Sequence, residues 1–76
     1  MYWRYETRFG EFRIVPRAYR YHVEWEGEVL GYYAEPLAAL EDLVGGHCSM
    51  PSSGLDTAVC GLPDELSEWE QVDFPT

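Results

Sequence analysis

The sequence contains no lysine, and its five arginines all lie within the first twenty positions. Fourteen residues are Asp or Glu, and only Glu6 and Glu11 fall in that same segment, so the other 56 positions carry twelve acids against no Lys or Arg. The net charge is −9. Such a chain repels nucleic acid and anionic membranes, which favours a basic partner, although charge alone is equally typical of a generally acidic protein.

Long apolar runs are also missing. No stretch approaches the roughly 20 apolar residues of a membrane span. The first ten residues, MYWRYETRFG, carry charges at positions 4, 6 and 8, where a signal peptide would need an apolar run of roughly 7–15 residues. We therefore expect a cytoplasmic protein with no membrane partner, in which Cys48 and Cys60 are free thiols.

The few cysteines and histidines do not form a metal or catalytic pattern. Zinc ligands usually come in close pairs, whereas eleven residues separate Cys48 from Cys60, and the adjacent His47 and Cys48 direct their side chains apart. No G-x-S-x-G or phosphate-binding glycine pattern occurs. We predict no metal, no cofactor and no catalytic residue, and expect both cysteines to pack as small apolar side chains.

Aromatic residues are abundant, with three Trp, six Tyr and three Phe in 76 residues. This length suits one compact domain over residues 1–76. So small a domain buries only about 60% of the surface its unfolded chain exposes. Most of the aromatic side chains are therefore expected in the core rather than on a base-stacking platform.

Residues 3–9 alternate apolar and charged side chains, and residues 12–15 continue the pattern after Gly10-Glu11. With Gly10 in a two-residue turn, Phe9 pairs with Phe12, Thr7 with Ile14, and every large apolar side chain faces one way. The same register places Arg8 opposite Arg13, a like-charge pair.

Residues 19–25 and 29–34 form a second pair of predicted strands, with Glu26-Gly27 as the turn. Tyr19, Tyr21, Val23 and Trp25 share one face in this interpretation. The register stays open: a two-residue turn brings Leu30 and Tyr32 to that face, whereas a three-residue loop brings Val29 and Tyr33.

Helical patterns follow. Pro36 opens the segment PLAALEDLVGG, which has Gly45-Gly46 as its stop. Residues 47–56 are rich in turn formers, Asp56 can cap one turn over 57–59, and PDELSEWE from Pro63 predicts a last helical piece. The expected fold class is α+β, with a four-stranded antiparallel sheet covered by one helix and a short C-terminal helix.

The acidic residues are the candidate binding residues. Glu24, Glu26 and Glu28 alternate, and alternate residues of a strand lie roughly 6.7 Å apart. Their carboxylates therefore form either a row along an edge or a tight group at a hairpin tip, with spacings on the scale of phosphates in DNA. Glu41 and Asp42 lie near a helix C-terminus, where the macrodipole disfavours them, with no nearby Lys or Arg. The predicted partner-binding residues are Glu24, Glu26, Glu28, Glu41, Asp42, Glu65, Glu68 and Glu70.

In length, acidity and α/β architecture the chain resembles small inhibitors encoded by phages and mobile elements, notably type I anti-CRISPR proteins. Segments such as FRIVPR, EVLGYY and GLPDELSEW also resemble small uncharacterised bacterial proteins. The first resemblance implies a non-enzymatic, monomeric inhibitor in the bacterial cytoplasm. It would bind the basic surface of a crRNA-guided surveillance complex as a DNA mimic, without contacting nucleic acid itself.

A second hypothesis is a regulatory or antitoxin-like module that binds protein through exposed aromatics. It predicts an exposed apolar patch centred on Trp3, Trp25 or Trp69. The arginine-rich N-terminal hairpin, which a DNA mimic does not need, is compatible with either hypothesis. Salt separates the two, because binding by carboxylates weakens steeply as ionic strength rises and aromatic docking does not.

Overall fold

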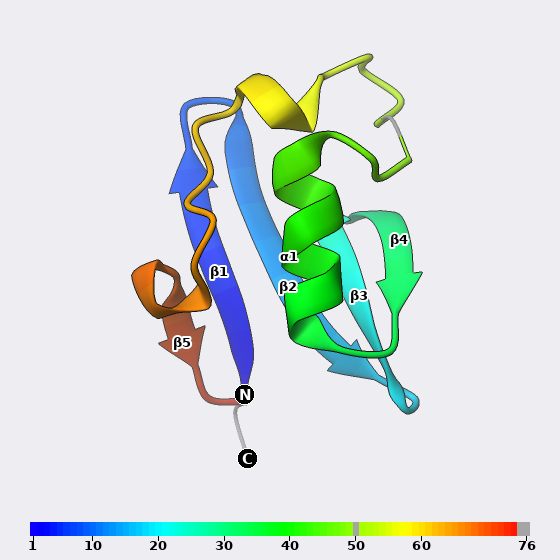
Figure 1. Ribbon diagram of the computed structural model, residues 1–76, viewed down its shortest axis with the longest axis vertical. Coiled ribbons are helices and arrows are strands. Elements are labelled where there is room, and N and C mark those ends of the chain that lie inside the picture. The colour runs from blue at the N-terminus through cyan, green and yellow to red at the C-terminus, as the bar shows by residue number, and fades with distance from the viewer. Residues whose placement is uncertain (50, 75–76) are drawn as a thin grey trace.

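The computed structural model describes residues 1–49 and 51–74. Within them, an antiparallel sheet of five strands has the order β4-β3-β2-β1-β5. One face of the sheet is covered by helix α1 and by the segment 61–69 beside it, which together we call the covering layer (Figure 1). The other face carries no further described helix or strand and is called the open face. The α+β class is confirmed. The element bounds are β1 Tyr2–Thr7, β2 Gly10–Arg17, β3 Arg20–Trp25, β4 Glu28–Tyr33, α1 Pro36–Gly45 and β5 Glu70–Val72, with 3₁₀ turns at Thr57–Val59 and Leu66–Glu68.

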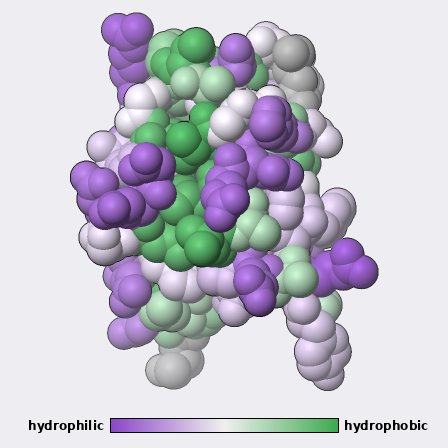
Figure 2. All heavy atoms as spheres, in the orientation of Figure 1, coloured by the Kyte–Doolittle hydropathy of each residue, from purple (hydrophilic) through white to green (hydrophobic). Residues whose placement is uncertain are grey.

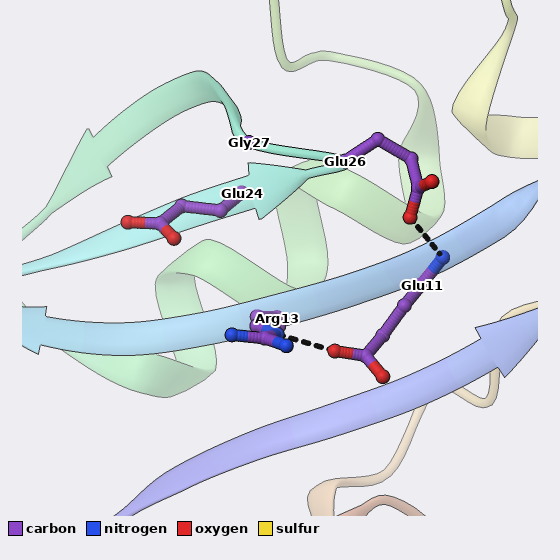
Figure 3. A pocket seen from close by; sticks show the side chains of 5 residues that line it. All are labelled: Glu11, Arg13, Glu24, Glu26 and Gly27. Carbon is purple, nitrogen blue, oxygen red and sulfur yellow. Dashed lines mark hydrogen bonds and ion pairs between the residues drawn. The ribbon is translucent and has the colours of Figure 1, made fainter.

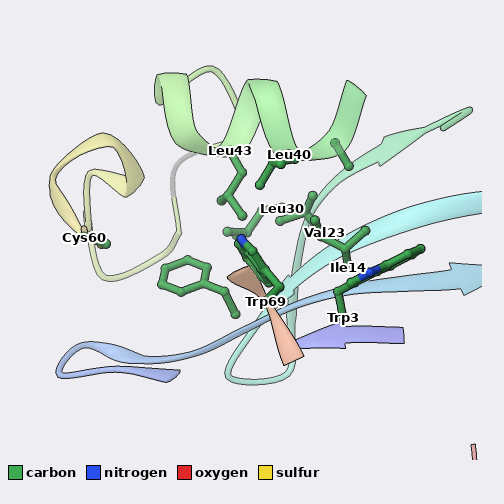
Figure 4. Close-up of a cluster of buried hydrophobic side chains, with 10 residues drawn as sticks. Trp3, Ile14, Val23, Leu30, Leu40, Leu43, Cys60 and Trp69 are labelled. Carbon is green, nitrogen blue, oxygen red and sulfur yellow. The ribbon is translucent and has the colours of Figure 1, made fainter. Parts of the chain in front are cut away.

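The core lies between the sheet and the covering layer (Figure 4). Phe12, Ile14 and Val23 point from the sheet, and Leu40 and Leu43 from α1, with at most 1% of each side chain exposed. Burial of side chains of this kind stabilises a fold by about 1.5–3 kcal/mol each. The covering layer is therefore fixed to the sheet by its apolar side, and its polar residues are carried on a rigid support.

The first hairpin has the predicted faces but not the predicted register. The turn is formed by residues 8–9, so that Thr7 pairs with Gly10 and Tyr5 with Phe12. Thr7 Oγ1 accepts a hydrogen bond from the backbone N–H of Phe9 (3.0 Å) and donates one to the carbonyl of Gly10 (3.0 Å), which favours the earlier turn. Gly10 has φ +126°, and a Cβ there would lie 2.9 Å from Trp25 Nε1, so this position requires glycine.

The second hairpin combines the two registers that the sequence left open. Glu26 and Gly27 both have positive φ (47° and 82°), as a two-residue type I′ turn requires. A bulge then shifts the register: Glu24 pairs with Val29, but Val23 pairs with Gly31, and Tyr21 therefore faces Tyr33. Leu30, the residue inserted by the bulge, is 1% exposed. The core thus receives Leu30 from one alternative and Tyr33 from the other.

The turn between β2 and β3 also differs from expectation. Tyr19 was predicted on a strand face, yet it lies in the turn and is fully exposed. Ala18 and Tyr19 both have positive φ (46° and 71°), which is unfavourable for residues with a Cβ. This tight turn nevertheless joins the strands at the pair Arg17–Arg20.

The C-terminal prediction was wrong in two respects. The short helix expected from Pro63 is a single 3₁₀ turn over Leu66–Glu68, and the chain then forms a fifth strand, β5, against the free edge of β1. A helix of two turns is marginal by itself, whereas pairing with β1 satisfies the backbone. Leu62, Leu66 and Trp69 of this segment nevertheless pack in or against the core.

The helical predictions in the middle of the chain are confirmed. Helix α1 spans Pro36–Gly45 and ends at Gly46 in the left-handed conformation. Asp56 caps the turn Thr57–Val59 by accepting a hydrogen bond from the N–H of Ala58 (3.0 Å). No helix among the described residues is long and apolar enough to cross a membrane.

Candidate functional site

Several charged side chains on the open face of the sheet are paired with one another. Arg4 on β1 donates to Glu11 on β2 (Nε to Oε1, 2.8 Å) and forms an ion pair with Glu70 on β5. Arg13 forms a further ion pair with the same Glu11. Glu11 thus lies between two arginines that are cross-strand neighbours and would otherwise repel each other.

These contacts shift the pKa of the groups involved. Burial raises the pKa of Glu11, but hydrogen bonds from Arg13 and Arg4 outweigh it and hold the pKa below its ordinary value. Hydrogen bonds to Glu11 in turn raise the pKa of Arg4 and of Arg13. The ionised state of this cluster is therefore part of the fold, and Glu70, a predicted binding residue, belongs to it.

Glu24 also has basic neighbours. Its carboxylate lies 3.6 Å from Arg17 Nε and 3.9 Å from His22 Nδ1, and its side chain is only 17% exposed. Figure 3 shows Glu24 beside a small pocket of about 160 Å³ that is also lined by Glu11, Arg13, Glu26 and Gly27. The arginine among these carboxylates lowers the net negative charge of the pocket.

Glu26 and Glu28 accept hydrogen bonds from residues of neighbouring segments. Glu26 accepts a hydrogen bond from the N–H of Glu11 (3.2 Å), drawn in Figure 3. Glu28 accepts two from Ser52, from its N–H (2.9 Å) and its hydroxyl (3.0 Å). Since the N–H of Ser49 also donates to the carbonyl of Leu30 (3.0 Å), this loop lies over the edge of β4, where it hinders strand addition.

The alternating glutamates therefore do not form the uncompensated row that their spacing suggested. Each has a partner within the fold, and the partners come from residues distant in sequence. Each of Glu24, Glu26 and Glu28 therefore also has a contact within the fold, and their role in binding a partner protein stays a prediction.

The acids of the covering layer are placed differently. Positions 34–69 contain no Lys or Arg, and in the described residues none of the acids there forms an ion pair. Asp42 is half-buried and contacts the Tyr33 hydroxyl. The exposed acids, which we call the acidic layer residues, are Glu41, Asp64, Glu65 and Glu68.

An apolar groove separates the two parts of the covering layer. It has a volume of about 240 Å³ and is lined by Leu40, Glu41, Val44, Gly45 and Asp64. Figure 2 shows hydrophobic surface between α1 and the neighbouring segment, with hydrophilic residues on both sides of it. The groove thus combines an apolar floor with one carboxylate from each wall.

Asp64 was not among the predicted binding residues. Asp64 lies in the segment PDELSEWE, for which the sequence predicted a helical piece, but no α-helix forms there. The absence of any basic residue within four positions of Asp64 is the signal that identifies it, and the same signal had been used for Glu41 and Asp42.

The cysteines are placed as apolar residues. Cys48 Sγ lies 3.2 Å from the Tyr33 hydroxyl, and burial raises the pKa of Cys48, of Cys60 and of Tyr33. A raised pKa disfavours the thiolate that a nucleophile or metal ligand needs. Residues 1–49 and 51–74 contain no group of three or more His, Cys, Asp or Glu side chains arranged to hold a metal ion.

The tryptophans are mostly internal. Trp3 is 9% and Trp69 4% exposed, and Trp25 Nε1 donates to the carbonyl of Phe9 (3.1 Å). Trp69 Nε1 similarly donates to the carbonyl of Pro63 (3.1 Å). Trp3 and Trp69 therefore do not provide the exposed aromatic centre that a docking patch requires.

No family model matches the chain, and no curated protein and no solved structure matches it. Function is therefore inferred from the charge and geometry of the described residues.

Proposed function

We propose that this protein is a non-enzymatic inhibitor that binds a basic, nucleic-acid-binding surface of a partner protein through the acidic layer residues. The observation that carries the proposal is the separation of charge. The arginines of the sheet neutralise Glu11, Glu24 and Glu70, whereas the covering layer has exposed carboxylates and no arginine. A basic partner supplies the missing counter-charges.

A carboxylate surface of this kind can replace phosphates. Lys and Arg side chains that bind a nucleic-acid backbone interact with negative charge at fixed positions. The acidic layer residues stand on a helix and a segment whose apolar sides are packed in the core. Because the support is already ordered, little conformational entropy is lost on binding, and the net charge of −9 accelerates the encounter with a basic surface.

The resemblance to type I anti-CRISPR proteins gives the partner a concrete form. In this hypothesis the acidic layer residues occupy the channel of a crRNA-guided surveillance complex that otherwise receives target DNA. The protein acts as a monomer in the cytoplasm of the bacterial host, and binding excludes DNA without any chemical step.

The test is competition between this protein and target double-stranded DNA for a purified crRNA-guided surveillance complex. Two variants have the same net charge and differ only in where three carboxylates are removed. The sheet variant is Glu24→Gln/Glu26→Gln/Glu28→Gln. The layer variant is Glu41→Gln/Glu65→Gln/Glu68→Gln.

We expect wild type and the sheet variant to displace the DNA, and the layer variant to do so about threefold to 150-fold less well, since three ion pairs contribute about 0.2–1 kcal/mol each. Displacement should weaken as salt rises. No displacement by wild type at any salt concentration would remove the proposal. Loss in the sheet variant alone would move the binding face to the β3–β4 hairpin.

A further inference from the structure

We propose that the groove between α1 and the segment 61–65 receives one arginine side chain of the partner. The inference rests on the proposed function, because it names the chemistry by which the acidic layer residues anchor a basic surface. It adds a specific pocket, Asp64 as a contact residue, and a preference for arginine over lysine.

The floor of the groove fits the stem of an arginine. Leu40 and Val44 lie one turn apart on α1, and both also contact the core. Gly45 lines the same groove without a side chain. Long basic side chains bury their methylene groups on such apolar surface while the charged end stays at the rim.

The rim supplies the charge. Glu41 lies on α1 and Asp64 on the neighbouring segment, and both line the groove and are exposed. A guanidinium has five N–H donors in a planar fork and can contact two carboxylates at once, whereas an ammonium is a compact and more strongly hydrated charge. Two carboxylates on opposite walls therefore favour arginine.

The size of the groove restricts what it can bind. Its volume of about 240 Å³ is below the roughly 300–1,000 Å³ of pockets that enclose small-molecule ligands. An amphipathic helix would need a longer apolar surface, with anchors over several turns. One side chain projecting from a partner surface fits this volume.

None of the protein's own five arginines lines the groove. Arg4, Arg13 and Arg17 are held by Glu11, Glu24 and Glu70 on the open face. Arg8 lies over the ring of Phe9, 5.0 Å from its centroid, at the first hairpin. An arginine that occupies the groove therefore comes from outside the described residues.

The probe is a blocked five-residue peptide, Ala-Leu-Arg-Leu-Ala, titrated into the ¹⁵N,¹³C-labelled protein and followed by NMR. Two matched peptides replace the arginine by lysine or by citrulline, which has nearly the shape of arginine and no charge. The groove variant is Glu41→Gln/Asp64→Asn. The control variant is Glu35→Gln/Asp73→Asn, which removes the same charge from exposed positions outside the groove.

We expect saturable shifts at Leu40, Val44 and Gly45 with the arginine peptide. Binding should be about five- to tenfold weaker with the citrulline peptide or in the groove variant, as two lost exposed ion pairs imply. The lysine peptide should bind about twofold to threefold more weakly, and the control variant should change affinity less than about twofold.

Three results would overturn the inference: equal binding of the citrulline peptide, equal weakening in the groove and control variants, or shifts confined to the open face. The competition assay separates this failure from failure of the proposed function. If peptide binding lacks the expected charge dependence while wild type still displaces DNA, the groove assignment falls and the proposed function stands. If the peptide binds as expected but wild type displaces no DNA at any salt concentration, the groove assignment stands and the proposed function is removed.

Discussion

The sheet variant and the layer variant should differ in stability as well as in binding. Each raises the net charge from −9 to −6, so relief of general charge repulsion is the same in both. The sheet variant, however, alters carboxylates that have partners within the fold. We expect it to be the less stable of the two, and this comparison needs no binding partner.

The contacts of the three altered glutamates give the size of the expected difference in unfolding free energy between the two variants. Glu28 accepts two hydrogen bonds from Ser52 and Glu26 accepts one from the backbone of Glu11. Glutamine can still accept these bonds, but a hydrogen bond to a charged group is about twice as strong as a neutral one, so each loses about 0.5 kcal/mol. Glu24 loses its attraction to Arg17, about 0.2–1 kcal/mol at this partly exposed site. The difference between the variants is therefore about 1.5–3 kcal/mol.

Urea unfolding followed by tryptophan fluorescence measures this difference. For a chain of this size the dependence on urea is about 1 kcal/mol per molar, so the midpoints should be separated by about 1.5–3 M. Equal midpoints would refute the reasoning, because the hairpin carboxylates would then be as free as those of the covering layer. Equal midpoints would also remove the distinction between paired and unpaired acids on which the proposed site depends.

Three further outcomes are expected. Ala18→Asn/Tyr19→Gly should stabilise the fold by about 1–2 kcal/mol in urea unfolding, because Asn and Gly adopt the left-handed conformation of this turn at lower cost than Ala and Tyr, and the exposed ring of Tyr19 loses no packing; a loss of stability would show that the turn is not strained. Glu11→Gln should cost about 1 kcal/mol at pH 7. Since the folded pKa of Glu11 is lowered, its contribution is present above the unfolded value of 4.5 and disappears as the pH falls through the folded pKa, so the stability gap to wild type should shrink as the pH is lowered below 4.5; a gap that stays constant on acidification would contradict this. The two cysteines should react with iodoacetamide at pH 8 at least about tenfold more slowly in the folded than in the unfolded protein, because burial raises the pKa of both thiols; equal rates by mass spectrometry would contradict this.

The alternation of side chains was sufficient to predict which sheet face is buried. Trp3 and Tyr5 share the core face with Phe12 and Ile14 as expected, even though the register of the hairpin was wrong. The error moved the pairing by an even number of positions, and such a shift leaves every side chain on its original face. The true register depends on the Thr7 side chain and on the close approach of Trp25 to Gly10, neither of which is visible in a local pattern.

The candidate site was less predictable, for a related physical reason. Whether a carboxylate is paired depends on neighbours across strands, and Arg17 reaches Glu24 only because β2 and β3 are adjacent. For α1 and the segment 61–69, the absence of any Lys or Arg from positions 34–69 already excludes a local arginine or lysine partner. The sequence could therefore show that Glu41, Glu65 and Glu68 lack a local basic partner, whereas it could not show that Glu24, Glu28 and Glu70 have partners within the fold.

The separation of charge along the chain becomes a separation between the two layers of the fold. All five arginines lie in positions 4–20, and these positions form β1, β2 and the start of β3. The sheet therefore contains every Lys or Arg that could neutralise an acid, and its own glutamates bind three of the five arginines. If the acids served only to raise net charge, their position relative to the arginines would not matter. Their presence as exposed groups on the layer without arginine, on both sides of an apolar groove, is the observation on which the proposed binding to a basic partner surface rests.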